Sequence, residues 1–84
     1  MDQFEDKCGD LIDQESWDQL EIAAVDQLDE TSGKCHRGYF YLGIAMYKME
    51  FYDQAIIAFM KSSEIKADDA QLQYNLGLSY FKEE

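Results

Sequence analysis

The sequence of 84 residues contains no proline, few glycines, two cysteines and only seven lysine or arginine residues. Without proline, no position loses a helical backbone hydrogen bond, so long helices can form. Apolar runs are only a few residues long and no basic-then-apolar leader opens the chain. We therefore expect no membrane insertion and a cytoplasmic location. Two cysteines without a framework of spacings predict reduced thiols rather than disulfides.

Basic residues are also too few to form the positive face that phosphate groups require, since the formal charge is −11. We therefore expect no nucleic acid partner. The charge is uneven: residues 1–33 carry eleven acidic side chains against one lysine, whereas residues 34–84 carry seven against six bases. We interpret the acidic third as a solvated surface, and a docking face for a basic partner is the alternative.

Apolar residues make up 46% of the chain and aromatics 14%, which is enough for one core at this length. The chain also repeats itself. Residues 40–50 align with 74–84 at a shift of 34, and residues 17–24 align with 52–59 at a shift of 35. Two segments that repeat at nearly the same period indicate a repeat architecture.

Within each copy the apolar residues recur at helical spacing. This pattern predicts five helices, at about 2–13, 16–28, 34–49, 52–66 and 70–83. The breaks between them are short, so neighbouring helices should be antiparallel. Thr31, Ser32 and Gly33 predict a turn and cap before the third helix, and Asp68 and Asp69 should cap the last one.

Four glycines lie inside predicted helices, and two of them, Gly43 and its repeat counterpart Gly77, lie between a leucine and another apolar residue. Each costs about 1 kcal/mol relative to alanine. Close approach of a packed neighbour is the natural compensation. We expect the helix over 52–66 to supply it at Gly43, with Ala55 as the matching small residue and Phe59 filling the gap.

These residues resemble the tetratricopeptide repeat family. The family's order of an aromatic, Leu-Gly, a large apolar residue, Ala and Phe is matched by Tyr39, Leu42, Gly43, Met46, Ala55 and Phe59. The following copy resembles it at Leu76, Gly77 and Tyr80. The N-terminal copy is degenerate. Met46 and Ala67 depart from the pattern, because an aromatic and a proline are commoner at those two places.

The resemblance implies an all-α fold, a right-handed α-solenoid of antiparallel helical hairpins with about two and a half repeats. In this interpretation residues 1–84 form one domain. It comprises a degenerate repeat at 1–35, a full repeat at 36–69 and the first helix of a truncated third repeat at 70–84. The first helices of the repeats would line a concave groove that binds a peptide or amphipathic helix of another protein.

Two apolar stripes follow these helices. The stripe predicted to form the core comprises Tyr39, Leu42, Met46, Phe59, Leu76 and Tyr80. A second stripe is rotated by about 100° around the helix axis and is apolar in both copies. This second stripe comprises Phe40, Ile44, Tyr47, Tyr74, Leu78 and Phe81. We interpret it as the partner-binding groove, unless further helices cover it. Asn75 could hold the backbone of a partner, because an amide both donates and accepts hydrogen bonds.

More specific chemistry finds little support. A carboxylate clamp for acidic chaperone tails would need Lys and Asn where Phe40 and Ile44 stand, and the charge of −11 would repel such a tail. Cys8, Cys35 and His36 are the only soft ligands or nucleophiles, and their spacing fits neither a zinc site nor a nucleophile–base pair. We expect no enzyme, no metal site and no cofactor.

The sequence therefore favours a protein–protein interaction module. A dedicated tetratricopeptide chaperone of a secreted client, as in type III secretion, is the alternative. The last predicted helix is apolar on more than one side, whereas solenoids normally end on a polar capping face. We expect that the chain is part of a longer array, or that it self-associates through this helix.

Overall fold

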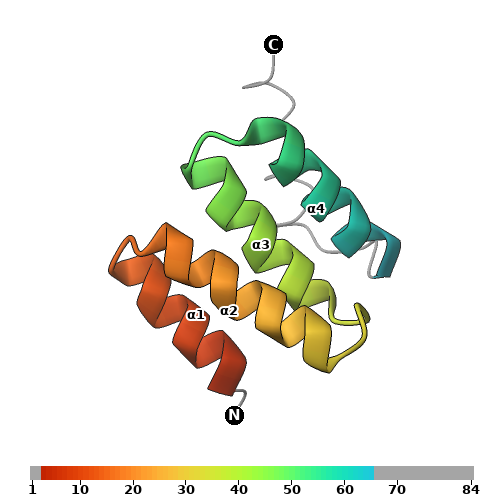
Figure 1. Ribbon diagram of the computed structural model, residues 1–84, viewed down its shortest axis with the longest axis horizontal. Helices are drawn as coiled ribbons and strands as arrows, with labels where there is room; N and C mark the ends of the chain where they lie inside the picture. The colour runs from red at the N-terminus through yellow and green to blue at the C-terminus, as the bar shows by residue number, and fades with distance from the viewer. Residues whose placement is uncertain (1–2, 66–84) are drawn as a thin grey trace.

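The computed structural model describes residues 3–65, and within that range it contains four helices and no strand. They are α1 (Gln3–Asp13), α2 (Trp17–Glu30), α3 (His36–Lys48) and α4 (Tyr52–Ile65). Each helix runs antiparallel to the next (Figure 1). The all-α prediction is confirmed. The helix predicted at 70–83 and its capping residues Asp68 and Asp69 lie outside the described residues.

The observed helix ends lie within two residues of the predicted ones. The predicted turn at 31–33 is present, and the chain reverses there because Ser32 and Gly33 have φ angles of 55° and 73°. The predicted cap is wrong. The N-cap of α3 is Cys35, whose Sγ accepts a hydrogen bond from the Gly38 amide at 3.4 Å. The turn residues end α2 instead, and two more residues pass before α3 begins.

The two hairpins end their first helices in the same way. Glu15 after α1 and Glu50 after α3 both adopt positive φ, at 55° and 67°. In each case the following amide, of Ser16 or Phe51, donates to a carbonyl five residues earlier, at 2.9 and 2.8 Å. This is the Schellman arrangement, which glycine usually provides. The end of α2 is similar, since Ser32 has a φ of 55° and the Gly33 amide donates to the Leu28 carbonyl at 2.8 Å.

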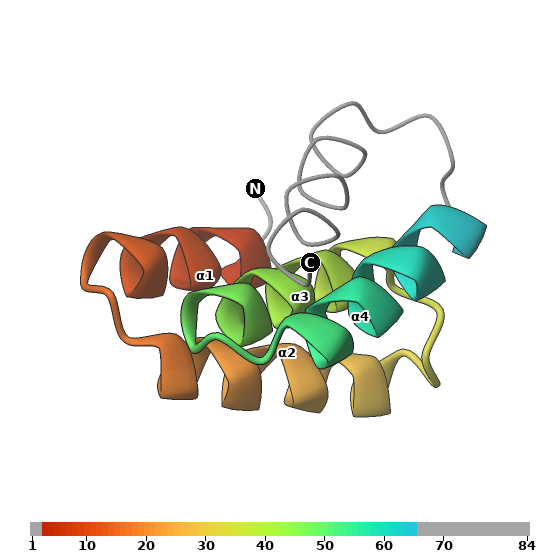
Figure 2. The same ribbon diagram turned by 90° about the horizontal axis from the view of Figure 1, so that it is seen from above.

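The core lies between successive helices and includes Leu20, Ala45, Met46, Ala55 and Phe59. The predicted contact at Gly43 is confirmed: a Cβ on this glycine would lie 2.5 Å from Cε1 of Phe59. A second link joins α4 to the start of α3, because the buried Ser62 donates its hydroxyl proton to the His36 carbonyl at 2.8 Å. Figure 2 shows α3 beside both α1 and α2.

Two of the predicted core residues differ from expectation. Met46 and Phe59 are buried as predicted, but Tyr39 and Leu42 are only partly buried. The reason is that they lie on the side of α3 that faces a hollow beside α4. Leu76 and Tyr80 lie outside the described residues.

Candidate interaction surfaces

An apolar hollow of about 270 Å³ lies between α3 and α4. From α3, the spacing of a helical face brings three side chains to it: Tyr39, Leu42 and Met46. From α4, the wall is formed by Gln54, Ile57, Ala58 and Lys61. Five of these seven side chains are apolar or aromatic, and the polar ones stand at the two ends of the α4 wall. The hollow therefore suits an apolar side chain flanked by polar groups.

Ile57 makes this surface unusual, because 55% of it is exposed. Met60, one turn further along α4, is 46% exposed. Large apolar side chains at neighbouring exposed positions beside a hollow are typical of a site that another chain covers. Lys61 is the one cationic side chain among the seven residues that line the hollow.

The predicted groove residues fall into three groups. Phe40 is buried, with 3% exposed, because its ring lies against the rings of Tyr41 and Phe59 at centroid distances of 5.5 and 6.1 Å. Ile44 and Tyr47 are partly buried and pack against the core. Their role in partner binding stays a prediction. The remaining four lie outside the described residues: Tyr74, Asn75, Leu78 and Phe81.

The sequence interpretation missed the α4 wall of the hollow. It assigned partner binding to the first helix of each repeat and expected the second helix only to pack against the first. The alignment nevertheless contains a signal, since Ile57 falls on Ile22 at a shift of 35. Both are largely exposed, at 55% and 61%. Ile22 and Ile57 occupy aligned positions in the second helices of the two hairpins, and neither is buried. This agreement between the two copies could have indicated an apolar surface that faces outward.

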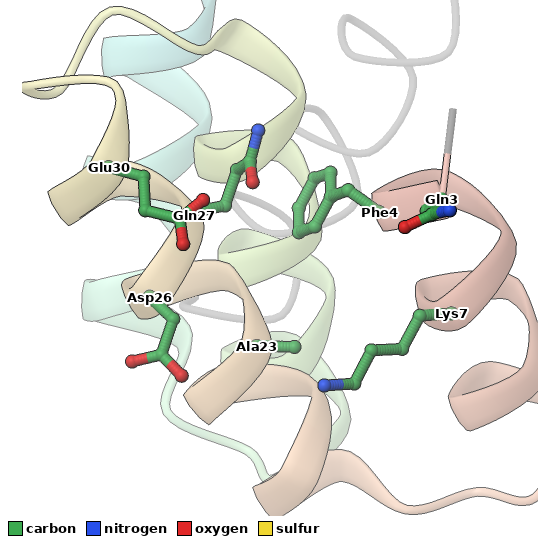
Figure 3. Close-up of a pocket in the computed structure, with 7 residues that line it drawn as sticks. All are labelled: Gln3, Phe4, Lys7, Ala23, Asp26, Gln27 and Glu30. Carbon is green, nitrogen blue, oxygen red and sulfur yellow. The ribbon is translucent and has the colours of Figure 1, made fainter. Parts of the chain in front are cut away.

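A second depression of about 430 Å³ lies between α1 and α2. Figure 3 shows its α1 wall, formed by Gln3, Phe4 and Lys7, opposite Ala23, Asp26, Gln27 and Glu30 on α2. The two acidic side chains are one helical turn apart and are both exposed. The Phe4 ring projects between the two helices in this view. We refer to this depression as the α1–α2 groove.

Beside this groove, Arg37 of α3 links α3 to α1. Its Nε donates to Glu5 Oε1 at 2.9 Å, and its Nη2 donates to the Tyr41 hydroxyl at 3.1 Å. The guanidinium carbon also lies 4.5 Å from the centroid of the Phe40 ring. The Tyr41 ring in turn meets Phe4 edge to face, with the centroids 5.6 Å apart. Aromatic rings and a carboxylate thus hold one arginine from several sides.

This arrangement changes the acid–base properties of two groups. Burial tends to lower the pKa of Arg37, but its interactions with Tyr41 and Glu5 outweigh burial and raise that pKa. Burial raises the pKa of the Tyr41 hydroxyl, and the nearby Arg37 opposes this rise only in part. Tyr41 is therefore favoured in its neutral form, in which its hydroxyl can accept from the guanidinium.

The thiols hold structural positions. Cys8 is completely buried in the core, and Cys35 caps α3. In the described part of the chain, no three His, Cys, Asp or Glu side chains are grouped so that they could hold a metal ion. None of the helices from Gln3 to Ile65 has the length and apolar character needed to cross a membrane.

Comparison with known proteins gives no family assignment, because no family model, curated protein or solved structure matches the chain.

Proposed function

We propose that this chain is a protein–protein interaction module of the tetratricopeptide type, built as a right-handed α-solenoid, that binds an amphipathic helix or peptide of a partner protein. It has no catalytic role in this proposal. The observation that carries the proposal is the apolar hollow between α3 and α4, together with the exposed Ile57 at its edge.

The repeated backbone supports the solenoid. Both hairpins join their two helices through the same Schellman turn, at Glu15 and Glu50, as a recurring repeat unit would. The contact of Gly43 with Phe59 supports the same interpretation, because the family resemblance places a small residue and a large aromatic at these two positions. In such arrays the stacked repeats create an extended concave binding surface.

The chemistry of the hollow supports a helical or extended partner segment. The α3 wall offers Tyr39, Leu42 and Met46 over two turns, and the apolar part of the α4 wall is Ile57 with Ala58. Apolar residues at helical spacing on one face of an amphipathic helix can pack against such walls. Lys61 at one end would pair with a carboxylate of the partner. We therefore expect the bound segment to carry two or three apolar residues at helical spacing and an acidic residue beside them.

The test uses the full chain and a displayed library of peptides of about 18 residues, long enough for five helical turns. Peptides enriched on the protein are synthesised, and their affinity is measured by isothermal titration calorimetry for the original protein and for Ile57→Asp. Because Ile57 is 55% exposed, this substitution should leave the melting temperature almost unchanged. We expect it to weaken binding by about tenfold or more, since it places a desolvated charge in an apolar contact.

Ile22→Asp is the matched control. It introduces the same charge at the aligned position of the earlier hairpin, at a residue that is 61% exposed and does not line the hollow. Its affinity should stay within about twofold of the original, because exposed charges at a distance are screened by salt. Equal losses in both variants, or no loss in Ile57→Asp, would show that the selected peptides bind elsewhere and would refute the proposal.

A further inference from the structure

The α1–α2 groove combines an aromatic ring with two carboxylates that have no ion-pair partner within residues 3–65. Phe4 and Ala23 contribute its apolar surface, and Asp26 and Glu30 stand on the α2 wall. Asp26 and Glu30 are exposed, and the one ion pair recorded for the described residues joins Arg37 to Glu5 instead. A ring beside unpaired carboxylates is the environment that a guanidinium group prefers.

The charge around the groove is strongly negative. Between residues 3 and 33 the sequence has ten acidic side chains and a single basic one, Lys7. Lys7 itself stands on the α1 wall, so one ammonium faces two carboxylates there. A basic segment would be attracted from a distance by this field and then held by the two carboxylates at close range.

The molecule already contains one example of this recognition. Arg37 lies over Phe40 and Tyr41, at 4.5 and 5.0 Å from their centroids, and pairs with Glu5 at 2.9 Å. The arginine and both rings belong to α3, and α1 supplies the carboxylate of Glu5. In the α1–α2 groove, the ring of Phe4 and the exposed carboxylates of Asp26 and Glu30 line one depression.

We propose that the α1–α2 groove binds an arginine-containing basic segment of a partner protein, with the guanidinium over Phe4 and paired with Asp26 and Glu30. This is a second docking surface, separate from the hollow between α3 and α4. Arginine suits it better than lysine, because the planar guanidinium can stack on a ring while it donates two parallel hydrogen bonds to a carboxylate.

Fluorescence anisotropy with three labelled peptides tests the proposal on the full chain. The probes are an alanine-based peptide with about four arginines, the same peptide with lysines and the same peptide with glutamates. At about 50 mM salt, where charge interactions reach beyond 10 Å, we expect the arginine peptide to bind several-fold more tightly than the lysine peptide. The glutamate peptide should not bind. Equal binding of all three peptides would overturn the proposal.

Variants locate the binding site. Asp26→Asn with Glu30→Gln should weaken binding of the arginine peptide by about tenfold or more, because it removes both carboxylates that would accept charge-assisted hydrogen bonds from the guanidinium. Lys7→Gln should strengthen it about two- to threefold by removing the competing ammonium.

The control removes two exposed acidic residues of the same hairpin that do not line the groove, Asp10→Asn with Asp29→Asn. The loss of affinity should then stay within about threefold, as expected for screened charges. If the control pair weakens binding as much as the groove pair, the attraction is a general effect of the negative charge and the groove is not a site. Thermal unfolding of each variant separates lost binding from lost folding. Binding of the arginine peptide does not involve Ile57. The proposal for the α1–α2 groove can therefore be refuted while the proposal for the hollow between α3 and α4 holds.

Discussion

Replacing Gly43 with alanine tests how α4 packs against α3. In an open helix this change would stabilise the protein by about 1 kcal/mol. Here the added Cβ would lie 2.5 Å from Cε1 and 2.6 Å from Cδ1 of Phe59. Carbon atoms in contact are about 3.5–4.0 Å apart, so the ring would have to move by about 1 Å. Phe59 is 1% exposed and its ring lies 6.1 Å from that of Phe40, so the core resists this movement.

Overpacking of this kind costs about 1–3 kcal/mol. Subtracting the gain of about 1 kcal/mol in helix propensity leaves a loss of about 0–2 kcal/mol in the free energy of unfolding. We expect Gly43→Ala to fall in the upper half of this range, because the ring that must move is buried. For a domain of this size each kcal/mol lowers the melting temperature by about 4–8 °C. Thermal and urea unfolding followed by far-UV circular dichroism measures both quantities.

Gly9 provides the matched control. It stands at the aligned position of the first hairpin, 34 residues earlier, and a Cβ there would meet nothing within 4 Å. Gly9→Ala should therefore stabilise the protein by up to about 1 kcal/mol. Combining Gly43→Ala with Phe59→Leu should cost less than the sum of the two single changes, because the smaller side chain removes the clash. A Gly43→Ala variant that melts at or above the original protein would refute the reasoning.

Two further predictions concern backbone strain and pH. Glu50→Gly should raise the free energy of unfolding by about 1 kcal/mol in urea titrations, because glycine adopts the observed φ of 67° without a Cβ penalty. Burial raises the pKa of Tyr41, so its neutral form contributes stability below the unfolded-state pKa. This contribution should be lost as the pH rises above about 10. Unfolding curves should show a loss of stability at alkaline pH in the original protein and in Tyr39→Phe. The loss should be smaller in Tyr41→Phe.

Much of the fold could be predicted because local periodicity determines it. Apolar residues at helical spacing located four helices to within two residues, and the cost of a glycine inside a helix predicted the close contact between Gly43 and Phe59. Such features depend on residues near each other in the sequence. The caps were harder to predict: Cys35 is an unusual N-cap, and Glu15 and Glu50 occupy turn positions that glycine normally fills.

The surfaces were less predictable, because both apolar stripes of α3 look equivalent in the sequence. The structure places Phe40 under neighbouring rings and leaves Tyr39 and Leu42 partly exposed beside α4. Which stripe is buried depends on contacts between helices, and one of these contacts is the pair of Arg37 with Glu5. These partners are 32 residues apart, and nothing in the local pattern of either residue indicates the other.

The order in which the helices contact one another also determines how the chain can fold. In the described residues every extensive helix contact joins neighbours in the sequence, and the contact of α3 with α4 is the largest. Short loops close quickly and at low entropic cost, so we expect rapid folding that starts at this hairpin. The smallest of these contacts joins α1 to α2. A partner bound in the hollow between α3 and α4 would therefore contact the hairpin that we expect to fold first. A basic segment bound in the α1–α2 groove would instead stabilise the helix pair with the smallest contact, which we expect to separate first on unfolding.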